Sequence, residues 1–155
     1  MNLYLDSNAL VKLYHQEAGS EKLIKLLNKH ADNLVLTIAD IAKIEFHSAF
    51  LKRVRKKEVS MKTADGVFTA FGKDISMFNV VDVDAAVKNK ALDLLKMIAS
   101  ERGLSTLDSI QLATALMAHQ VFPVDVFVTS DKILFAVAKE YFNIFNPEAT
   151  ISKTP

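Results

Sequence analysis

The chain has 155 residues, enough for one domain with a substantial core, and its lack of cysteine excludes disulfides, thiolate zinc sites and cysteine nucleophiles. Its 19 basic and 18 acidic side chains leave a net charge of +1, which gives no indication of a nucleic-acid partner. No apolar run approaches the roughly 18 residues of a membrane-spanning helix, and the N-terminus lacks the pattern of a signal peptide. We therefore expect a single domain over residues 1–155, in the cytoplasm and without a membrane partner.

Short apolar runs alternate with longer amphipathic stretches along the whole chain. Strands are predicted at Leu3–Leu5, Leu34–Thr37, Phe78–Val83, Val126–Thr129 and, as a last short strand, Asn143–Phe145. Helices are predicted from about Ala9, from an N-cap at Ser20, over residues 39–57 and 61–74, from Asp84 to about Glu101, from Ser105, and from Asp131 to about Tyr141. This alternation is typical of an α/β fold in which helices cover both faces of a central, mainly parallel sheet of four or five strands.

Two aspartates come just after predicted strands. Asp6 directly follows the first strand, and Asp131 follows the fourth strand after one intervening residue, Ser130. In an open parallel sheet, ligands bind outside the carboxyl ends of the strands, so both side chains are expected at the edge of the sheet where chemistry usually occurs. The alternative is that each aspartate only caps the helix that follows it.

Two further acids lie near helix starts. The helix neighbours of Glu45 are small or apolar, which turns its carboxylate towards the core, where it needs a cation or a proton. The alternative for Glu45 is a structural salt bridge to a distant lysine or arginine. Asp108 lies in the first turn of a helix, where the helix dipole favours a carboxylate. Its alternative is a capping box with Ser105, in which Asp replaces the usual Glu.

If these four acids converge, their mutual repulsion requires a compensating positive charge. A divalent metal is the natural solution, and ligands that are all oxygen atoms favour Mg²⁺ or Mn²⁺ over zinc. Mg²⁺ typically binds a few carboxylates together with substrate phosphates. The chemistry that this set implies is attack of a metal-activated water on a phosphodiester.

Four short segments carry these acids in order, and together they resemble the PIN-domain (PilT N-terminus) ribonucleases, in particular the VapC-type toxins of toxin–antitoxin pairs. The segments are YLDSNALVKLY from Tyr4, IEF from Ile44, LSTLDSIQLATAL from Leu104 and FVTSDK from Phe127. Their order and spacing agree with the family from Met1 to about Pro147. No motif matches between Val59 and Val83, so substrate contacts there cannot be transferred from the family.

The resemblance implies a PIN-like three-layer α/β/α domain that acts as a magnesium-dependent endoribonuclease, with Mn²⁺ as a possible substitute. It also implies that the catalytic and metal-binding set is Asp6, Glu45, Asp108 and Asp131. Asp6 and Asp108 would bind the metal directly, whereas Glu45 would ligate through water or orient the attacking water. Asp131 would be the fourth acid. Ser7 and Ser130 lie beside two of these acids and are expected to contact phosphate or metal-bound water, unless they serve as helix caps.

A run of basic residues ends the helix that carries Glu45. Lys52, Arg53, Arg55 and Lys56 are its candidate RNA contacts, and Lys12, close to Asp6, is a fifth. The alternative is a solvated helix end, because cations suit the negative end of the helix dipole. If the run does track phosphates, binding of RNA should fall steeply with salt.

The family resemblance implies three partners, namely an RNA substrate, a cognate antitoxin protein and a second copy of this chain in a homodimer. Two alternatives within the fold are a PIN nuclease with a role in RNA processing and a non-catalytic interaction domain. A phosphotransferase with an aspartyl nucleophile is a further rival. Such enzymes typically have a second aspartate two residues after the first, where this chain has Asn8.

Overall fold

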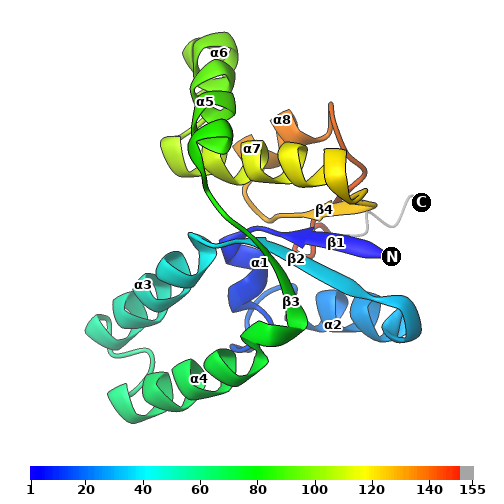
Figure 1. Cartoon of the computed structure of the whole chain (residues 1–155). Coiled ribbons are helices and arrows are strands. Elements are labelled where there is room, and N and C mark those ends of the chain that lie inside the picture. The colour runs from blue at the N-terminus through cyan, green and yellow to red at the C-terminus, as the bar shows by residue number, and fades with distance from the viewer. Residues whose placement is uncertain (151–155) are drawn as a thin grey trace, which may run out of the picture.

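Five short strands form one all-parallel sheet in the computed structural model, which describes residues 1–150. The strands are β1 (Asn2–Leu5), β2 (Val35–Ala39), β3 (Phe78–Val81), β4 (Val126–Val128) and β5 (Ile144–Phe145). Their order across the sheet is β3-β2-β1-β4-β5 (Figure 1). Because β1 pairs with β2 on one side and β4 on the other, the chain reverses its direction of strand addition at β1 and β4. This sheet confirms the predicted fold class.

Helices cover both faces of the sheet (Figure 1). One face carries α1 (Ser7–Val11), α2 (Ser20–Lys29), α3 (Ala42–Arg55) and α4 (Met61–Asp74). The other carries α5 (Ala85–Leu94), α7 (Thr106–Val121) and α8 (Lys132–Ala138), with a π-helical turn at Leu95–Ala99 and the short α6 (Ser100–Arg102) after α5. Two 3-10 turns, Ala31–Asn33 and Ile75–Met77, precede β2 and β3. Within residues 1–150 the structure has no helix both long and apolar enough to span a membrane.

The alternation of side chains along β1 divides the core into two halves. Tyr4 packs with residues of α5, α7 and α8, whereas Leu3 and Leu5 pack with residues of α1, α2, α3 and α4. All three side chains are fully buried. Successive residues of a strand point to opposite faces, so a central strand with helices on both sides must be apolar throughout. Packing on both faces therefore holds the sheet, and with it the carboxyl ends of its strands, in a fixed position.

Several helix boundaries differ from the sequence prediction. The N-cap of α2 is Gly19, not Ser20, because the Ser20 hydroxyl is already engaged in the preceding turn. It accepts a hydrogen bond from the Glu17 N–H at 3.1 Å and donates one to the His15 carbonyl at 3.1 Å. The helix expected from residue 39 begins at Ala42, since β2 continues to Ala39.

The segment after β5 is anchored to the opposite end of the chain. Gly19 has a φ of +86°, and a Cβ atom there would lie 2.8 Å from the carbonyl carbon of Pro147, so only glycine allows this approach. The Lys22 ammonium donates to the Ala149 carbonyl at 2.5 Å. These contacts hold residues 147–149 against α2.

Candidate active site

Asp6 lies at the carboxyl edge of the sheet, where β1 and β4 end side by side. Its N–H donates to the Val128 carbonyl at 3.2 Å, which extends the pairing of the two strands by one step. One carboxylate oxygen accepts the Ala9 N–H at 2.7 Å and caps α1, and the other accepts the Thr129 hydroxyl at 2.5 Å. The side chain is 3% exposed. Asp6 is therefore both a helix cap and a buried acid at the switch point of the sheet.

Glu45 reaches this edge from the first turn of α3. Its Oε2 accepts two hydrogen bonds, one from the Ser7 hydroxyl at 2.5 Å and one from the Gln111 amide at 2.7 Å. Glu45 is half-buried, and within residues 1–150 it forms no salt bridge. The described part of the chain therefore contains no structural salt bridge to Glu45.

Asp108 and Asp131 come from the N-terminal ends of α7 and α8. Ser105 accepts the Asp108 N–H at 3.1 Å and donates its hydroxyl to Asp108 Oδ2 at 2.6 Å. Asp131 Oδ1 accepts the N–H groups of Ile133 and Leu134, both at 2.8 Å. Asp6 and Asp131 therefore do cap the helices that follow them, and Ser105 caps α7. A capping carboxylate still has a second oxygen that can face a ligand.

Electrostatic coupling links the four acids. Burial raises the pKa of Asp6 to about 7, against the hydrogen bonds from Thr129 and Ala9, and the charges of Asp108 and Glu45 raise it further. Burial also raises the pKa of Asp108, to which the charge of Asp131 adds. Each acid therefore lies within the electrostatic reach of at least one other.

The donor chemistry fits a hard divalent cation, because every acid supplies oxygen and the group carries uncompensated repulsion. The side chains do not form a closed ligand set, however. Among residues 1–150, no three His, Asp or Glu side chains are placed together as metal ligands. Asp6 and Asp108 are each held by a hydroxyl instead, so those hydroxyls compete for the same carboxylate oxygens.

Three polar residues around the acids were not singled out as site residues by sequence reasoning. Gln111 contacts Glu45, Thr129 contacts Asp6 and Ser105 contacts Asp108. A usable signal existed for two of them. Gln111 is three residues after Asp108 and so shares its helix face, and Thr129 is the first residue after β4. The third, Ser105, was predicted only as a helix cap.

The two predicted serines differ in their surroundings. Ser7 donates to Glu45 and accepts the Gln111 amide at 2.9 Å, so it belongs to the Glu45 cluster and does not cap a helix. Ser130 has a buried hydroxyl oxygen with no hydrogen-bond partner among residues 1–150. A buried polar atom of this kind carries a desolvation cost that a ligand or water can relieve.

The surroundings of Lys12 do not favour the predicted contact with RNA. Its side chain is 3% exposed, and its ammonium pairs with Glu17 at 2.8 Å and Glu148 at 2.6 Å. Burial alone would lower its pKa, but the two carboxylates outweigh burial and the pKa is raised. A buried, doubly paired ammonium is not available to a phosphate. Lys12 instead joins the turn after α1 to the segment that follows β5.

The basic end of α3 divides into paired and exposed cations. Arg53 is half-buried and pairs with Glu17 at 2.5 Å. Lys52, Arg55 and Lys56 are exposed, and Lys56 is 3.8 Å from Glu58. Lys52 also lines a groove of about 440 Å³ with Glu45, Ser7 and the apolar Ile44 and Leu107.

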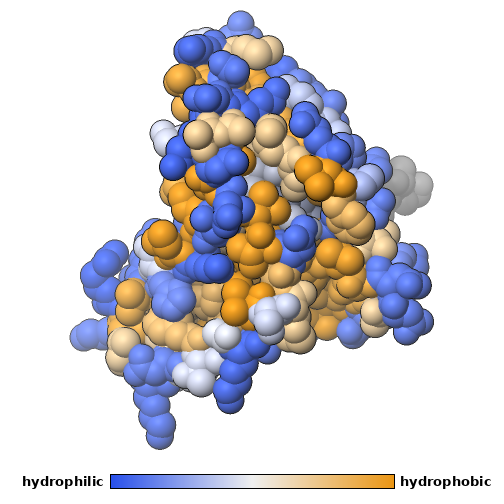
Figure 2. Space-filling view, in the orientation of Figure 1, coloured by the Kyte–Doolittle hydropathy of each residue, from blue (hydrophilic) through white to orange (hydrophobic). Residues whose placement is uncertain are grey.

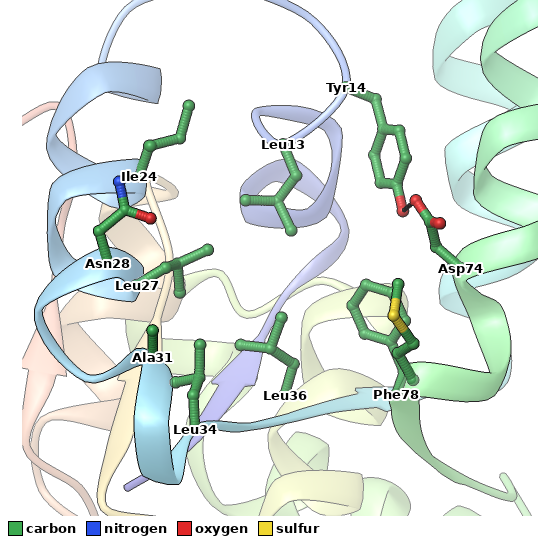
Figure 3. A pocket seen from close by; sticks show the side chains of 11 residues that line it. Leu13, Tyr14, Ile24, Leu27, Asn28, Ala31, Leu34, Leu36, Asp74 and Phe78 are labelled. Carbon is green, nitrogen blue, oxygen red and sulfur yellow. Dashed lines mark hydrogen bonds between the residues drawn. The ribbon is translucent and has the colours of Figure 1, made fainter.

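A separate apolar groove of about 470 Å³ lies between α2 and the start of β3. Figure 2 shows apolar side chains gathered along the middle of the face on which β3 lies towards the viewer. In Figure 3, Leu13, Leu27 and Leu36 point into this groove. At one wall, the Tyr14 hydroxyl donates to Asp74 at 3.0 Å. The groove is on the α1–α4 side of the sheet, away from the carboxyl ends of the strands.

A family model described as the PIN domain matches residues 3–140. Solved structures share the fold at low identity. A VapBC2 from Rickettsia felis bound to a DNA fragment from its promoter is 16% identical, covering 94% of this chain and 98% of that chain, with a TM-score of 0.66. VapC20 from Mycobacterium tuberculosis, described as a sarcin–ricin loop cleaving toxin, is 16% identical, with coverages of 86% and 93% and a TM-score of 0.64. A toxin–antitoxin complex from Klebsiella pneumoniae is 16% identical, with coverages of 94% and 97% and a TM-score of 0.60. No curated protein matches the sequence.

Proposed function

The chain belongs to the PIN-domain family, and from this premise we propose that it is a metal-dependent endoribonuclease that serves as the toxin of a toxin–antitoxin pair. The observation that carries the proposal is the placement of the buried Asp6 at the carboxyl edge of β1 and β4, where the charges of Asp108 and Glu45 help to raise its pKa. A metal-dependent hydrolase requires acids close together at a fixed edge of a sheet. Without a cation, the repulsion between such acids destabilises the folded state.

In this proposal Asp6 and Asp108 would hold Mg²⁺, or Mn²⁺ in its place. The metal would supply an activated water and stabilise the charge that develops on the phosphate. Glu45 would bind the metal through water or orient the attacking water, and Asp131 would be the fourth acid. Ser7 holds Glu45 through its hydroxyl, and Ser130, with its unpartnered hydroxyl, is the stronger candidate of the two for a phosphate or water contact.

We assign the approach of the RNA to the groove beside Glu45. Lys52 lines this groove, and Arg55 and Lys56 continue as exposed cations towards the end of α3. They offset the repulsion between the acids and a phosphodiester chain. Arg53 contributes less than these three, because Glu17 already neutralises it. We also propose a cytoplasmic location, in keeping with an RNA target.

The partner that we propose is an antitoxin protein, in line with the structural neighbour that is described as a toxin–antitoxin complex. The apolar groove of Figure 3 suits an apolar segment of that partner. The acids suit a basic side chain, preferably Arg, whose fork donates two parallel hydrogen bonds to a carboxylate. We further propose that residues 1–155 form one domain and that the chain is a homodimer, both by analogy with the family.

The purified chain, incubated with an end-labelled single-stranded RNA, tests the activity. We expect internal cleavage with Mg²⁺ or Mn²⁺, none with EDTA, and none with the Asp6→Asn variant. Tight binding of RNA without turnover under every metal condition would support a non-catalytic interaction domain instead. Expression without the neighbouring gene tests the toxin role, because a processing nuclease should leave growth unchanged whereas a toxin should arrest it.

A further inference from the structure

We propose that Gln111 is the positioning residue for Glu45, and that Tyr4 anchors the Gln111 amide at its other end. The inference rests on the proposed nuclease function. It goes beyond it by assigning a role to two buried residues that carry no charge and bind no substrate. Four elements contribute to the contact, since Tyr4 is on β1, Ser7 on α1, Glu45 on α3 and Gln111 on α7.

The contacts form an unbroken path from the centre of the sheet to the acid. The fully buried Tyr4 hydroxyl donates to Gln111 Oε1 at 2.8 Å. On the other side of the amide, Nε2 donates to Glu45 Oε2 at 2.7 Å and to Ser7 Oγ at 2.9 Å. The Ser7 hydroxyl then donates to the same Glu45 oxygen at 2.5 Å. The carbonyl oxygen and the NH₂ group of the Gln111 amide therefore both form hydrogen bonds.

The chemistry of the partners allows only one orientation of the amide. An ionised carboxylate only accepts hydrogen bonds, so Glu45 must face the NH₂ group and not the carbonyl oxygen. Tyr4 fits this orientation, because its hydroxyl donates to the carbonyl oxygen at the other end of the amide. Turning the amide over would place two oxygens against each other at Glu45, so Glu45 sets the orientation of the amide and Tyr4 anchors its other end.

This arrangement determines which oxygen of Glu45 is available. Oε2 receives both hydrogen bonds, whereas Oε1 has no hydrogen-bond partner among residues 1–150. Oε1 is thus the oxygen left for the attacking water or a water on the metal. Gln111 also follows Asp108 by one turn of α7, so the same hydrogen bond ties the helix of Asp108 to the carboxylate of Glu45.

A purely structural role is the competing explanation, because α7 packs on the core and the Gln111 side chain is itself buried. The two explanations differ in what removal of the polar pair does. Gln111→Leu alone removes the acceptor of the buried Tyr4 hydroxyl, which lowers stability for reasons unrelated to Glu45. The double variant Tyr4→Phe with Gln111→Leu removes both polar groups together, so it keeps a satisfied core while Glu45 loses its amide donor.

The experiment compares four proteins in full-length form, namely the wild type, the double variant, Glu45→Gln, and the double variant combined with Glu45→Gln. Each is measured for kcat and KM on a short single-stranded RNA, for Mn²⁺ affinity by calorimetry and for thermal unfolding. Gln120→Leu, at an exposed glutamine of the same helix, is the control. It should match the wild type in every measurement.

We expect the double variant to unfold near the wild-type temperature and to lose about 10–100-fold in kcat or Mn²⁺ affinity, with little change in KM. In the Glu45→Gln background the same substitutions should add less than a twofold loss, because their effect passes through Glu45. Wild-type kcat and Mn²⁺ affinity in the double variant would overturn the proposal. A further tenfold loss in the Glu45→Gln background would overturn the route through Glu45.

Failure of the proposed function gives a different result. If the wild type binds Mn²⁺ but cleaves no RNA, the nuclease assignment is wrong, and the calorimetric comparison still decides the role of Gln111. An unchanged Mn²⁺ affinity in the double variant then overturns the positioning role, and a tenfold weaker affinity supports it. A wild type that binds no Mn²⁺ overturns both proposals.

Discussion

Asp6 is the residue at which folding and the proposed chemistry oppose each other most directly. It caps α1 and accepts the Thr129 hydroxyl, yet it is buried beside Asp108 and Glu45. Its pKa of about 7 means that, near neutral pH and without a metal, the folded chain carries this acid at a cost. A bound cation would remove that cost by stabilising the charged form.

This conflict predicts a pH dependence of stability in EDTA. Because the pKa of Asp6 is raised on folding, its contribution is fully present below about pH 4 and is lost as the pH rises to about 7. The loss in the free energy of unfolding amounts to at most about 4 kcal/mol. Asp6→Asn should remove this dependence and be the more stable protein at pH 8. Chemical denaturation at several pH values measures it, and parallel curves for the two proteins would contradict it.

Glu45 gives a prediction of the opposite kind. Gln at position 45 can still accept from Ser7 and Gln111 through its carbonyl oxygen, so Glu45→Gln should fold normally. It should, however, need a higher Mn²⁺ concentration for half-maximal cleavage or lose at least tenfold in kcat. Cleavage assays over a range of Mn²⁺ concentrations measure this. Normal activity at all concentrations would make Glu45 a structural acid.

Local sequence patterns predicted where these acids lie along the chain, but not which residues form hydrogen bonds with them. Asp6 and Asp131 follow strands, and Asp108 begins a helix, so each could be placed from its local pattern. Gln111 and Thr129 take their roles from residues more than 60 positions away, which no local pattern reveals. The pairing of Lys12 with Glu148 could not be predicted for the same reason, since the two residues are 136 positions apart.

Among the elements, α3 carries both an acid of the candidate site and the cations proposed to guide RNA towards it. Its basic end is not uniform, because Glu17 neutralises Arg53 while Lys52 is exposed beside the groove of Glu45. Substitutions of Lys52 and Arg53 therefore form a matched pair for testing whether this helix guides RNA to the site.

Lys52→Ser should weaken the binding of single-stranded RNA to the Asp6→Asn protein and reduce the slope of log affinity against log salt by about 0.7. Arg53→Ser should leave this slope nearly unchanged, although it removes one of the two cations paired with Glu17 and lowers stability slightly. Fluorescence anisotropy at four or more salt concentrations measures both. Equal slopes for the wild type and Lys52→Ser would assign the basic run to a solvated helix end.

Element types were predictable from apolar periodicity, whereas some boundaries were not. The helix predicted over residues 61–74 is α4 as found, and Ser60 caps it through the Thr63 N–H. The helix expected from Asp84 to Glu101 does begin with an Asp84 cap and ends at Gly103, where φ is +68°. It contains a π-helical turn at residues 95–99, which the sequence pattern does not signal.

In the molecule as a whole, the proposed catalytic edge and the apolar groove are different surfaces. The acids lie at the carboxyl ends of β1 and β4, whereas the groove of Figure 3 lies between α2 and the start of β3. A partner that inhibits by inserting a basic side chain while its apolar segment occupies the groove must therefore span both. The two contacts can be separated by mutation.

Ile24, 39% exposed on α2, lines the groove, so Ile24→Asp should weaken the antitoxin complex at least tenfold and leave cleavage by the free chain unchanged. Burying a carboxylate against apolar side chains is costly, which is the reason for the expected loss. Leu92→Asp is the control, because Leu92 is 49% exposed on α5 and lies outside the groove. Calorimetry with the purified neighbour-encoded protein measures both. Equal affinities for the two variants would exclude this groove as the docking surface.

The overall topology was predictable because strands and helices alternate without exception, and right-handed crossovers leave few arrangements for a parallel sheet. The strand order was not, since nothing local to β1 shows that it pairs with β4 across more than 120 residues. That pairing is what places Asp6 beside Thr129. The core of the candidate site is thus a consequence of topology and not of any one motif.

The dependence of RNA cleavage on metal concentration in the wild type and in Asp108→Asn tests the central claim most directly. The account predicts internal cleavage by the wild type that rises with Mn²⁺ and saturates, and a folded Asp108→Asn protein with no detectable cleavage at any concentration. Full activity of Asp108→Asn, or cleavage by the wild type that persists in EDTA, would contradict it.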